Sequence, residues 1–223
     1  MKDREDNLYK AFIFDLDGVL VDTAKYHFNA WSRLANSLGF DFTEQQNEEL
    51  KGISRIDSLK KILKWGNQEV NEENELNRLA NIKNTWYIEM IEKMTPDEIL
   101  PGVYDFLVLS QKEGIKIALG SASKNAEIIL KRTGITHFFD AIVDGNLVKK
   151  SKPDPEVFIK AQQLLKVKIQ ECVVFEDAQA GIDAAKAVSM KVVGIGLPSN
   201  LTGADMVTPD LENWTPDKLI AKI

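Results

Sequence analysis

Two aspartates, Asp15 and Asp17, follow a short apolar run near the start of the 223-residue chain. The run at residues 9–14 is rich in aromatic and β-branched side chains, which is typical of a buried strand. Side chains alternate along extended backbone, so the two carboxylates are expected to point to the same side. Two such charges about 4 Å apart repel by about 4 kcal/mol at a surface-like dielectric constant. A divalent cation would relieve this repulsion, and ligands that are all oxygen atoms favour Mg²⁺.

The same residues also fit a plainer interpretation, in which a strand ends in an ordinary Asx turn at Gly18. However, the turn would be followed at once by the apolar residues 19–21, and only then by Asp22 and Thr23. Burying a charge is costly, so carboxylates at the end of a core strand need a metal, a partner or open water. We therefore favour an acidic site over a simple polar turn.

Strands that alternate with helices must position these acids. Helical patterns separate most of the predicted strands, and glycines such as Gly114 and Gly134 follow predicted helices. Alternation of this kind predicts an α/β fold with a doubly wound, parallel, Rossmann-like sheet. Ligands bind such sheets at the carboxyl ends of the strands. The predicted strands are residues 9–14, 115–119, 141–143, 172–175, 192–195 and 205–207.

The roughly 70 residues after the first strand contain helical patterns and no strand pattern. Thr43 with Gln46 resembles a capping box, and Ser54 is placed to open another helix. Alternation of strands and helices resumes after Pro96. We therefore predict a small helical cap domain at residues 22–96, inserted into an α/β core formed by residues 1–21 and 97–223.

Polar residues follow or precede core elements in four places. Each place alone is ordinary, since a serine-rich loop is usually a helix cap and a lysine before proline is usually solvated. An acidic pair after a strand is also usually part of a turn. The residues are Asp15 and Asp17, Ser121, Lys152, and the pair Glu176 and Asp177.

Taken together and in this order, the four places resemble the haloacid dehalogenase-like phosphotransferases. The stretch DLDGVLVDT, residues 15–23, matches the DxDGxxxD/T signature of that family, and the resemblance covers essentially the whole chain. It implies that Asp15 is phosphorylated and that Asp17 is the general acid/base. Both roles are chemically sound, because a carboxylate can accept a phosphoryl group and a nearby carboxyl group can protonate the leaving oxygen.

The resemblance also implies a magnesium cofactor. Asp15, the main-chain carbonyl of Asp17 and Asp177 would hold the ion, with Glu176 either a ligand or directly behind the ligands. Lys152 and Ser121 would stabilise the equatorial oxygens of the transferred phosphoryl group, since electrostatic stabilisation dominates phosphoryl transfer.

The predicted cap must select the acceptor. Arg55 falls at the start of a predicted helix, where the macrodipole disfavours a cation, so a nearby anion such as a distal phosphate is expected. The alternative for Lys51 and Arg55 is a solvated face of the cap, and His27 could equally be a surface residue of the cap.

Three segments, TAKYHFNAW, LKGISRIDSL and LGSASKN, resemble the β-phosphoglucomutase branch of the family. That branch converts β-D-glucose 1-phosphate into D-glucose 6-phosphate through β-glucose 1,6-bisphosphate. In that branch the histidine of the first segment, which corresponds to His27 here, positions the general acid/base. The chain departs from the branch in the prefix before Tyr9, at Asp154 and at residues 145–150. These lie away from the motif positions, although the last could alter a loop near Lys152. The substrate contacts implied here are His27, Trp31, Lys51, Gly52, Arg55, Ser58, Lys83, Ser121, Ala122, Ser123, Lys124, Asn125 and Lys152.

Two other functions fit parts of the pattern. A sugar-phosphate phosphatase of the same family would differ from a mutase by admitting water to the aspartyl phosphate. A phosphoaccepting signalling receiver is a different class, but receivers lack an inserted cap and carry their acidic pair before the phosphoacceptor. We therefore favour the mutase.

Composition limits the partners. The chain is 44% hydrophobic with a net charge of −6, which argues against nucleic acid or anionic membrane as a partner. Its start, MKDREDN, has no apolar signal segment and is expected to be a disordered lead-in, and no apolar run approaches the ~18 residues of a membrane span. The single cysteine, Cys172, is expected to be buried in a reducing compartment. We expect a monomeric cytoplasmic enzyme that acts on a small sugar phosphate.

Overall fold

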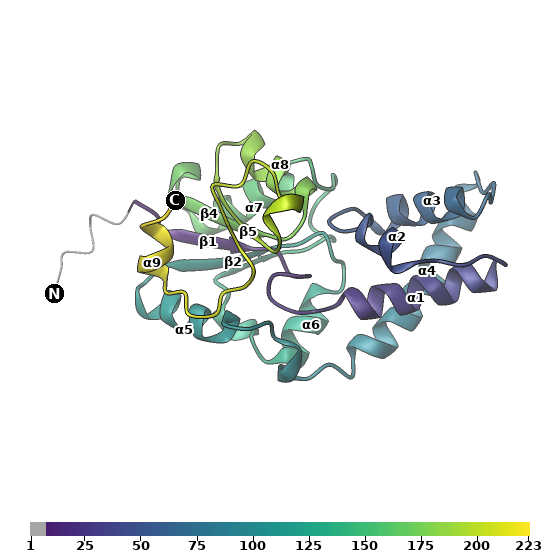
Figure 1. The fold of residues 1–223 in the computed structure, drawn as a ribbon, viewed down its shortest axis with the longest axis horizontal. Coiled ribbons are helices and arrows are strands. Elements are labelled where there is room, and N and C mark those ends of the chain that lie inside the picture. The colour runs from purple at the N-terminus through teal and green to yellow at the C-terminus, as the bar shows by residue number, and fades with distance from the viewer. Residues whose placement is uncertain (1–7) are drawn as a thin grey trace.

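The computed structural model describes residues 8–223, so the predicted lead-in at residues 1–7 lies outside the described residues. A parallel sheet of six strands forms its centre, in the order β3-β2-β1-β4-β5-β6 (Figure 1). The strand order reverses between β1 and β4, which is where ligands bind in sheets of this kind. The strands are β1 (Ala11–Phe14), β2 (Lys116–Gly120), β3 (Ala141–Val143), β4 (Cys172–Glu176), β5 (Lys191–Ile195) and β6 (Met206–Thr208).

Helices cover both faces of the sheet, as the doubly wound prediction requires. Phe12 and Phe14 of β1 pack with residues of α5, α6 and α9 on one face. Ile13 and Cys172 pack with residues of α7 and α8 on the other, so the prediction that Cys172 is buried is confirmed. The core helices are α5 (Val103–Lys112), α6 (Ala126–Thr133), α7 (Glu156–Leu165), α8 (Gln179–Ala187) and α9 (Pro216–Ile220).

Four further helices lie beside the sheet rather than on it (Figure 1). Trp31, Leu59 and Leu79 belong to a separate apolar cluster that these helices form among themselves. The predicted capping box is present, because Thr43 Oγ1 accepts from the Gln46 N–H and Gln46 Oε1 accepts from the Thr43 N–H. The helices are α1 (Ala24–Ser37), α2 (Glu44–Glu48), α3 (Arg55–Trp65) and α4 (Glu73–Ile91).

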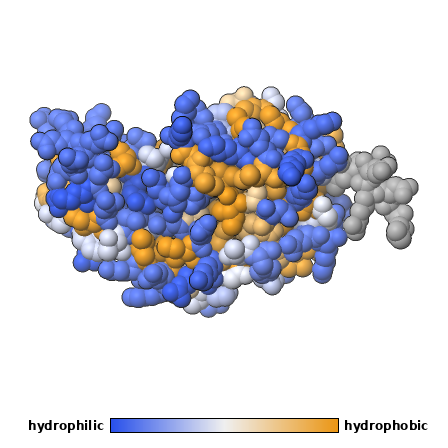
Figure 2. Space-filling view, turned by 180° about the vertical axis from the view of Figure 1, so that it is seen from behind, coloured by the Kyte–Doolittle hydropathy of each residue, from blue (hydrophilic) through white to orange (hydrophobic). Residues whose placement is uncertain are grey.

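The chain crosses between the two parts twice, and the crossings run side by side. Val21 pairs with Ile99 in an antiparallel bridge, and the Asp22 N–H donates to the Glu98 carbonyl at 3.2 Å. This arrangement supports the division we propose, with residues 22–96 as the cap and the rest as the core. The face of the cap seen in Figure 2, at the left of that view, is mostly hydrophilic, as expected when its apolar side chains pack inside.

Within residues 8–223, none of the helices combines the length and the apolar character that a membrane crossing needs. The expectations of a cytoplasmic and monomeric protein stay predictions.

Candidate active site

Three carboxylates gather where β1 and β4 end. Asp15 directly follows β1, Glu176 is the last residue of β4, and Asp177 comes next. The Asp15 N–H donates to the Phe175 carbonyl at 2.9 Å, which fixes the two strand ends at the same level. One oxygen from each carboxylate lies within 4.8 Å of the others. This acidic cluster contains three of the four residues predicted to hold a metal.

Lys152 lies between two of these carboxylates. It precedes α7, and its side chain is 1% exposed. The ammonium donates to Asp15 Oδ1 at 2.6 Å and to Glu176 Oε1. Burial opposes the charge on Lys152, but the two carboxylates raise its pKa overall. Burial also raises the pKa of Glu176 to about 7, against the attraction of Lys152.

The buried carboxylate of Glu176 needs a glycine opposite it. Its Oε2 accepts from the Ala178 N–H at 3.1 Å, and a Cβ at Gly181 of α8 would overlap this carboxylate. We expect Gly181→Ala to lower the free energy of unfolding by about 1–3 kcal/mol, because a packed core resists extra volume. It should also lower the kcat of the phosphoryl transfer expected from the sequence, because a displaced Glu176 would displace Lys152 as well. Denaturant unfolding and steady-state kinetics measure both.

Gly39→Ala is the matched control for this substitution. Gly39 has a φ of +89°, and a Cβ there would meet nothing within 4 Å. This variant should therefore lose stability through backbone strain and keep its kcat. An unchanged kcat in the Gly181 variant would show that the carboxylate tolerates displacement, contrary to our expectation.

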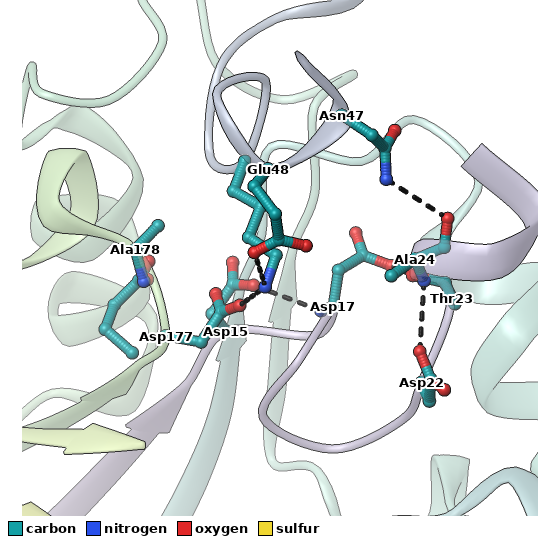
Figure 3. A network of polar contacts seen from close by, with 11 residues as sticks. Asp15, Asp17, Asp22, Thr23, Ala24, Asn47, Glu48, Asp177 and Ala178 are labelled. Carbon is teal, nitrogen blue, oxygen red and sulfur yellow. Dashed lines mark hydrogen bonds and ion pairs between the residues drawn. The ribbon is translucent and has the colours of Figure 1, made fainter. Parts of the chain in front are cut away.

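The carboxylate of Asp17, the predicted general acid/base, is held by a residue at the start of the cap. It accepts a hydrogen bond from Thr23 Oγ1, just before α1, and Figure 3 shows the side chain turned toward Thr23. The extended backbone ends at Phe14, so the strict alternation that would align Asp17 with Asp15 does not continue. Burial, with the nearby charge of Asp15, raises the pKa of Asp17 to about 6. A carboxyl group with this pKa can donate or accept a proton near neutral pH.

The loop after β2 is preorganised by its own side chains. Ser121 is buried, and its Oγ accepts from the Ser123 N–H at 3.1 Å. Ser123 Oγ in turn accepts from the Asn125 N–H at 3.3 Å, immediately before α6. Loops that lead into a helix N-terminus favour anions. Asn125 also donates to Asn84 Oδ1 of α4 at 2.9 Å, which links this loop to the cap.

A buried lysine on α4 faces the core from the cap. Lys83 Nζ lies 3.0 Å from His27 Nδ1, and it lies over the rings of Trp31 and Tyr87 at 4.4 and 4.5 Å. Burial lowers the pKa of both His27 and Lys83 well below their usual values, and Arg55 lowers them further. Both nitrogens can form hydrogen bonds, and both residues line the cavity described below.

The predicted residues from both parts of the chain surround one cavity of about 870 Å³. Glu176 is the exception, since it lies fully buried and does not line the cavity. The predicted residues that do line it are Asp15, Asp17, His27, Trp31, Lys51, Gly52, Arg55, Ser58, Lys83, Ser121, Ala122, Ser123, Lys124, Asn125, Lys152 and Asp177.

Several lining residues were missed by sequence reasoning. Asn77, Asn81 and Asn84 follow one another along α4 at helical spacing, and this amide stripe could have been noticed. Tyr87 also lines the cavity, and its hydroxyl is buried without a hydrogen-bond partner in the described chain. No sequence signal distinguishes Tyr87 from an ordinary core residue.

Comparison with known proteins identifies the family. Residues 12–195 match the family model of the haloacid dehalogenase-like hydrolases. This chain belongs to that family. A relative in Bacillus subtilis (strain 168), named beta-phosphoglucomutase, is 44% identical over 211 residues, which is 94% of this chain and 93% of the relative. The match to this relative therefore covers nearly the whole of both proteins.

Two further comparisons show how the family varies. The crystal structure of a beta-phosphoglucomutase from Clostridium difficile superposes on this haloacid dehalogenase-like fold with a TM-score of 0.92, at 43% identity and 96% coverage of each chain. A relative in Thermotoga maritima, named phosphorylated carbohydrates phosphatase, is 32% identical and is matched over 82% of both chains. Mutases and phosphatases therefore both occur among the relatives of this protein.

Proposed function

We propose that this protein is a β-phosphoglucomutase, an isomerase that interconverts β-D-glucose 1-phosphate and D-glucose 6-phosphate. The observation that carries the proposal is that one cavity is lined both by Asp15 and Asp177 of the core and by His27, Trp31 and Lys83 of the cap. A phosphoryl-transfer centre alone fits any member of the family, but a cap face that combines basic, aromatic and amide side chains fits a sugar phosphate. The full-length likeness to the Bacillus protein supports the same conclusion.

Asp15 is the proposed nucleophile. Phosphorylated Asp15 would first donate its phosphoryl group to the free hydroxyl of the sugar monophosphate, so the bond from phosphorus to Asp15 breaks while the hydroxyl proton passes to Asp17. The resulting bisphosphate would reorient, and Asp15 would then attack the other phosphoryl group, whose bond to the sugar oxygen breaks as that oxygen takes the proton from Asp17. Lys152 and Ser121 would stabilise the phosphoryl oxygens in both steps.

The acidic cluster fits a magnesium ion, since its donors are all carboxylate oxygens close to one another. Asp15 and Asp177, with the Asp17 carbonyl, would hold the ion, whereas Glu176 is committed to Lys152 and Ala178. A bound magnesium ion would neutralise part of the negative charge of the phosphate.

The cap would separate isomerisation from hydrolysis. When it closes over a sugar, water is kept from the aspartyl phosphate, and the reaction is committed to the sugar hydroxyls. Arg55 and Ser58 of α3 line the cavity from the cap and the loop at Lys124 lines it from the core, so they are the proposed contacts of the sugar and its second phosphate.

A coupled assay for glucose 6-phosphate tests the function. We expect formation from β-glucose 1-phosphate and not from the α-anomer, with a requirement for Mg²⁺ and priming by a sugar bisphosphate. Rapid release of inorganic phosphate from sugar phosphates without an isomer would instead establish a phosphatase, as the name of the Thermotoga relative suggests for that protein.

Asp17→Asn separates the proton transfer from the nucleophilic step. We expect kcat of the mutase reaction to fall by about 10²–10⁴-fold, the usual contribution of general acid/base catalysis. Phosphorylation of Asp15 by an acyl phosphate, whose leaving group needs no proton, should continue. Mass spectrometry of the phosphoenzyme and the coupled assay give the two rates. Equal losses in both would contradict the assignment of Asp17 as general acid/base.

A further inference from the structure

Lys51 belongs to the cap, in the turn after α2, yet its ammonium reaches the acidic cluster of the core. The Nζ lies 3.5 Å from Asp177 Oδ2 and 2.9 Å from Glu48 Oε2. Figure 3 shows the Glu48 carboxylate facing those of Asp15 and Asp177. Lys51 therefore bridges the cap to a residue that we propose as a metal ligand.

The backbone holds this turn against the core. Gly52 has a φ of +74°, and a Cβ built there would lie 3.1 Å from the Ala178 Cβ. The turn that carries Lys51 thus packs directly on the residue after Asp177. The bridge follows from that close approach, because the Lys51 side chain is long enough to reach Asp177 from this turn of the cap.

Asp177 needs positive charge more than an ordinary surface acid does. Its side chain is 10% exposed, and Glu176 and Asp15 lie beside it with the same charge. Lys152 is engaged by Asp15 and Glu176. In the described chain, Lys51 is the cation that forms an ion pair with Asp177.

We propose that Lys51 is a positioning residue that competes with the divalent cation for Asp177, and that Glu48 limits this competition by holding the same ammonium. The inference rests on the proposed function only in taking Asp177 as a metal ligand. A divalent ion satisfies the charge of Asp177 and repels the ammonium, which is then free to turn into the sugar cavity that Lys51 also lines. Because such coupling is reciprocal, a ligand that draws Lys51 away from Asp177 should also increase the affinity of the site for the metal ion.

Metal affinity measured without any sugar tests the proposal. Isothermal titration with MgCl₂ should give a dissociation constant about fivefold lower for Lys51→Met than for the unmodified protein, at the low end of typical coupling. Lys51 keeps 36% of its side chain exposed, so the substitution should not prevent folding. The matched control is Lys150→Met, which removes the same charge from the wall of the same cavity but from an ion pair with Asp154. It should leave the dissociation constant unchanged.

Glu48→Gln should change the affinity for Mg²⁺ in the opposite direction. Without the Glu48 carboxylate the Lys51 ammonium would pair with Asp177 alone, so Mg²⁺ should bind more weakly. In the Lys51→Met background the same substitution should have no effect, because Glu48 acts through Lys51. An unchanged or weaker Mg²⁺ affinity in Lys51→Met would overturn the proposal, as would an effect of Glu48→Gln that persists in the double variant. A protein that bound Mg²⁺ as expected but failed the isomerase assay would contradict only the proposed function.

Discussion

Replacing Asp15 by asparagine is expected to abolish turnover, with kcat lowered by at least about 10⁴-fold, as for loss of other covalent nucleophiles. The amide is a poor nucleophile toward phosphorus, and it removes the charge that pairs with Lys152 at 2.6 Å. The shape of the side chain is kept, so the fold should persist. When the variant is mixed with a sugar bisphosphate and the reaction is rapidly quenched, mass spectrometry should find no phosphoenzyme.

Asp205→Asn is the matched control for Asp15→Asn. Asp205 also pairs with lysines, Lys186 and Lys191, at 2.7 and 3.0 Å, but it lies away from the cavity. This variant should retain kcat and still form the phosphoenzyme. Phosphorylated Asp15→Asn protein, with the phosphate on another residue, would overturn the assignment of the nucleophile.

The sequence predicted most elements because their signals are local. Capping by Thr43 and Ser54, and glycines that follow helices, mark the helix ends whatever the tertiary structure. The carboxyl ends of parallel strands share one edge, so residues as distant as Asp15 and Glu176 could be brought together by topology alone. The gathering of the core residues was predictable for that reason.

The details that tertiary packing decides were not predictable. Asp17 lies beyond the end of β1 and accepts a hydrogen bond from Thr23, and no periodic pattern predicts that contact. Lys51 lines the cavity, as its predicted contact with the sugar requires, but its ion pair with Asp177 depends on the close packing of the cap turn on the core. Contacts between two parts of a chain depend on how those parts sit together, which motif spacing does not encode.

Lys152→Met is expected to damage both stability and catalysis. It leaves Asp15 and Glu176 as neighbouring buried carboxylates without their cation, and breaking a buried pair in this way costs about 3–5 kcal/mol. The loss of a positive charge aimed at the phosphoryl oxygens should lower kcat by about 10²–10³-fold. Denaturant unfolding in the presence of a chelator gives the stability, and the coupled assay with Mg²⁺ gives kcat.

A second substitution separates the two losses. In Lys152→Met with Glu176→Gln, one of the two unpaired buried charges is gone, and much of the lost stability should return. The kcat should stay low, because the missing ammonium stabilised the transferred phosphoryl group and not merely the fold. Recovery of kcat together with stability would mean that Lys152 serves only to neutralise Glu176. Failure to regain stability would mean that the cost arises from packing around the methionine, and the charge balance of the buried cluster would not explain the position of Lys152.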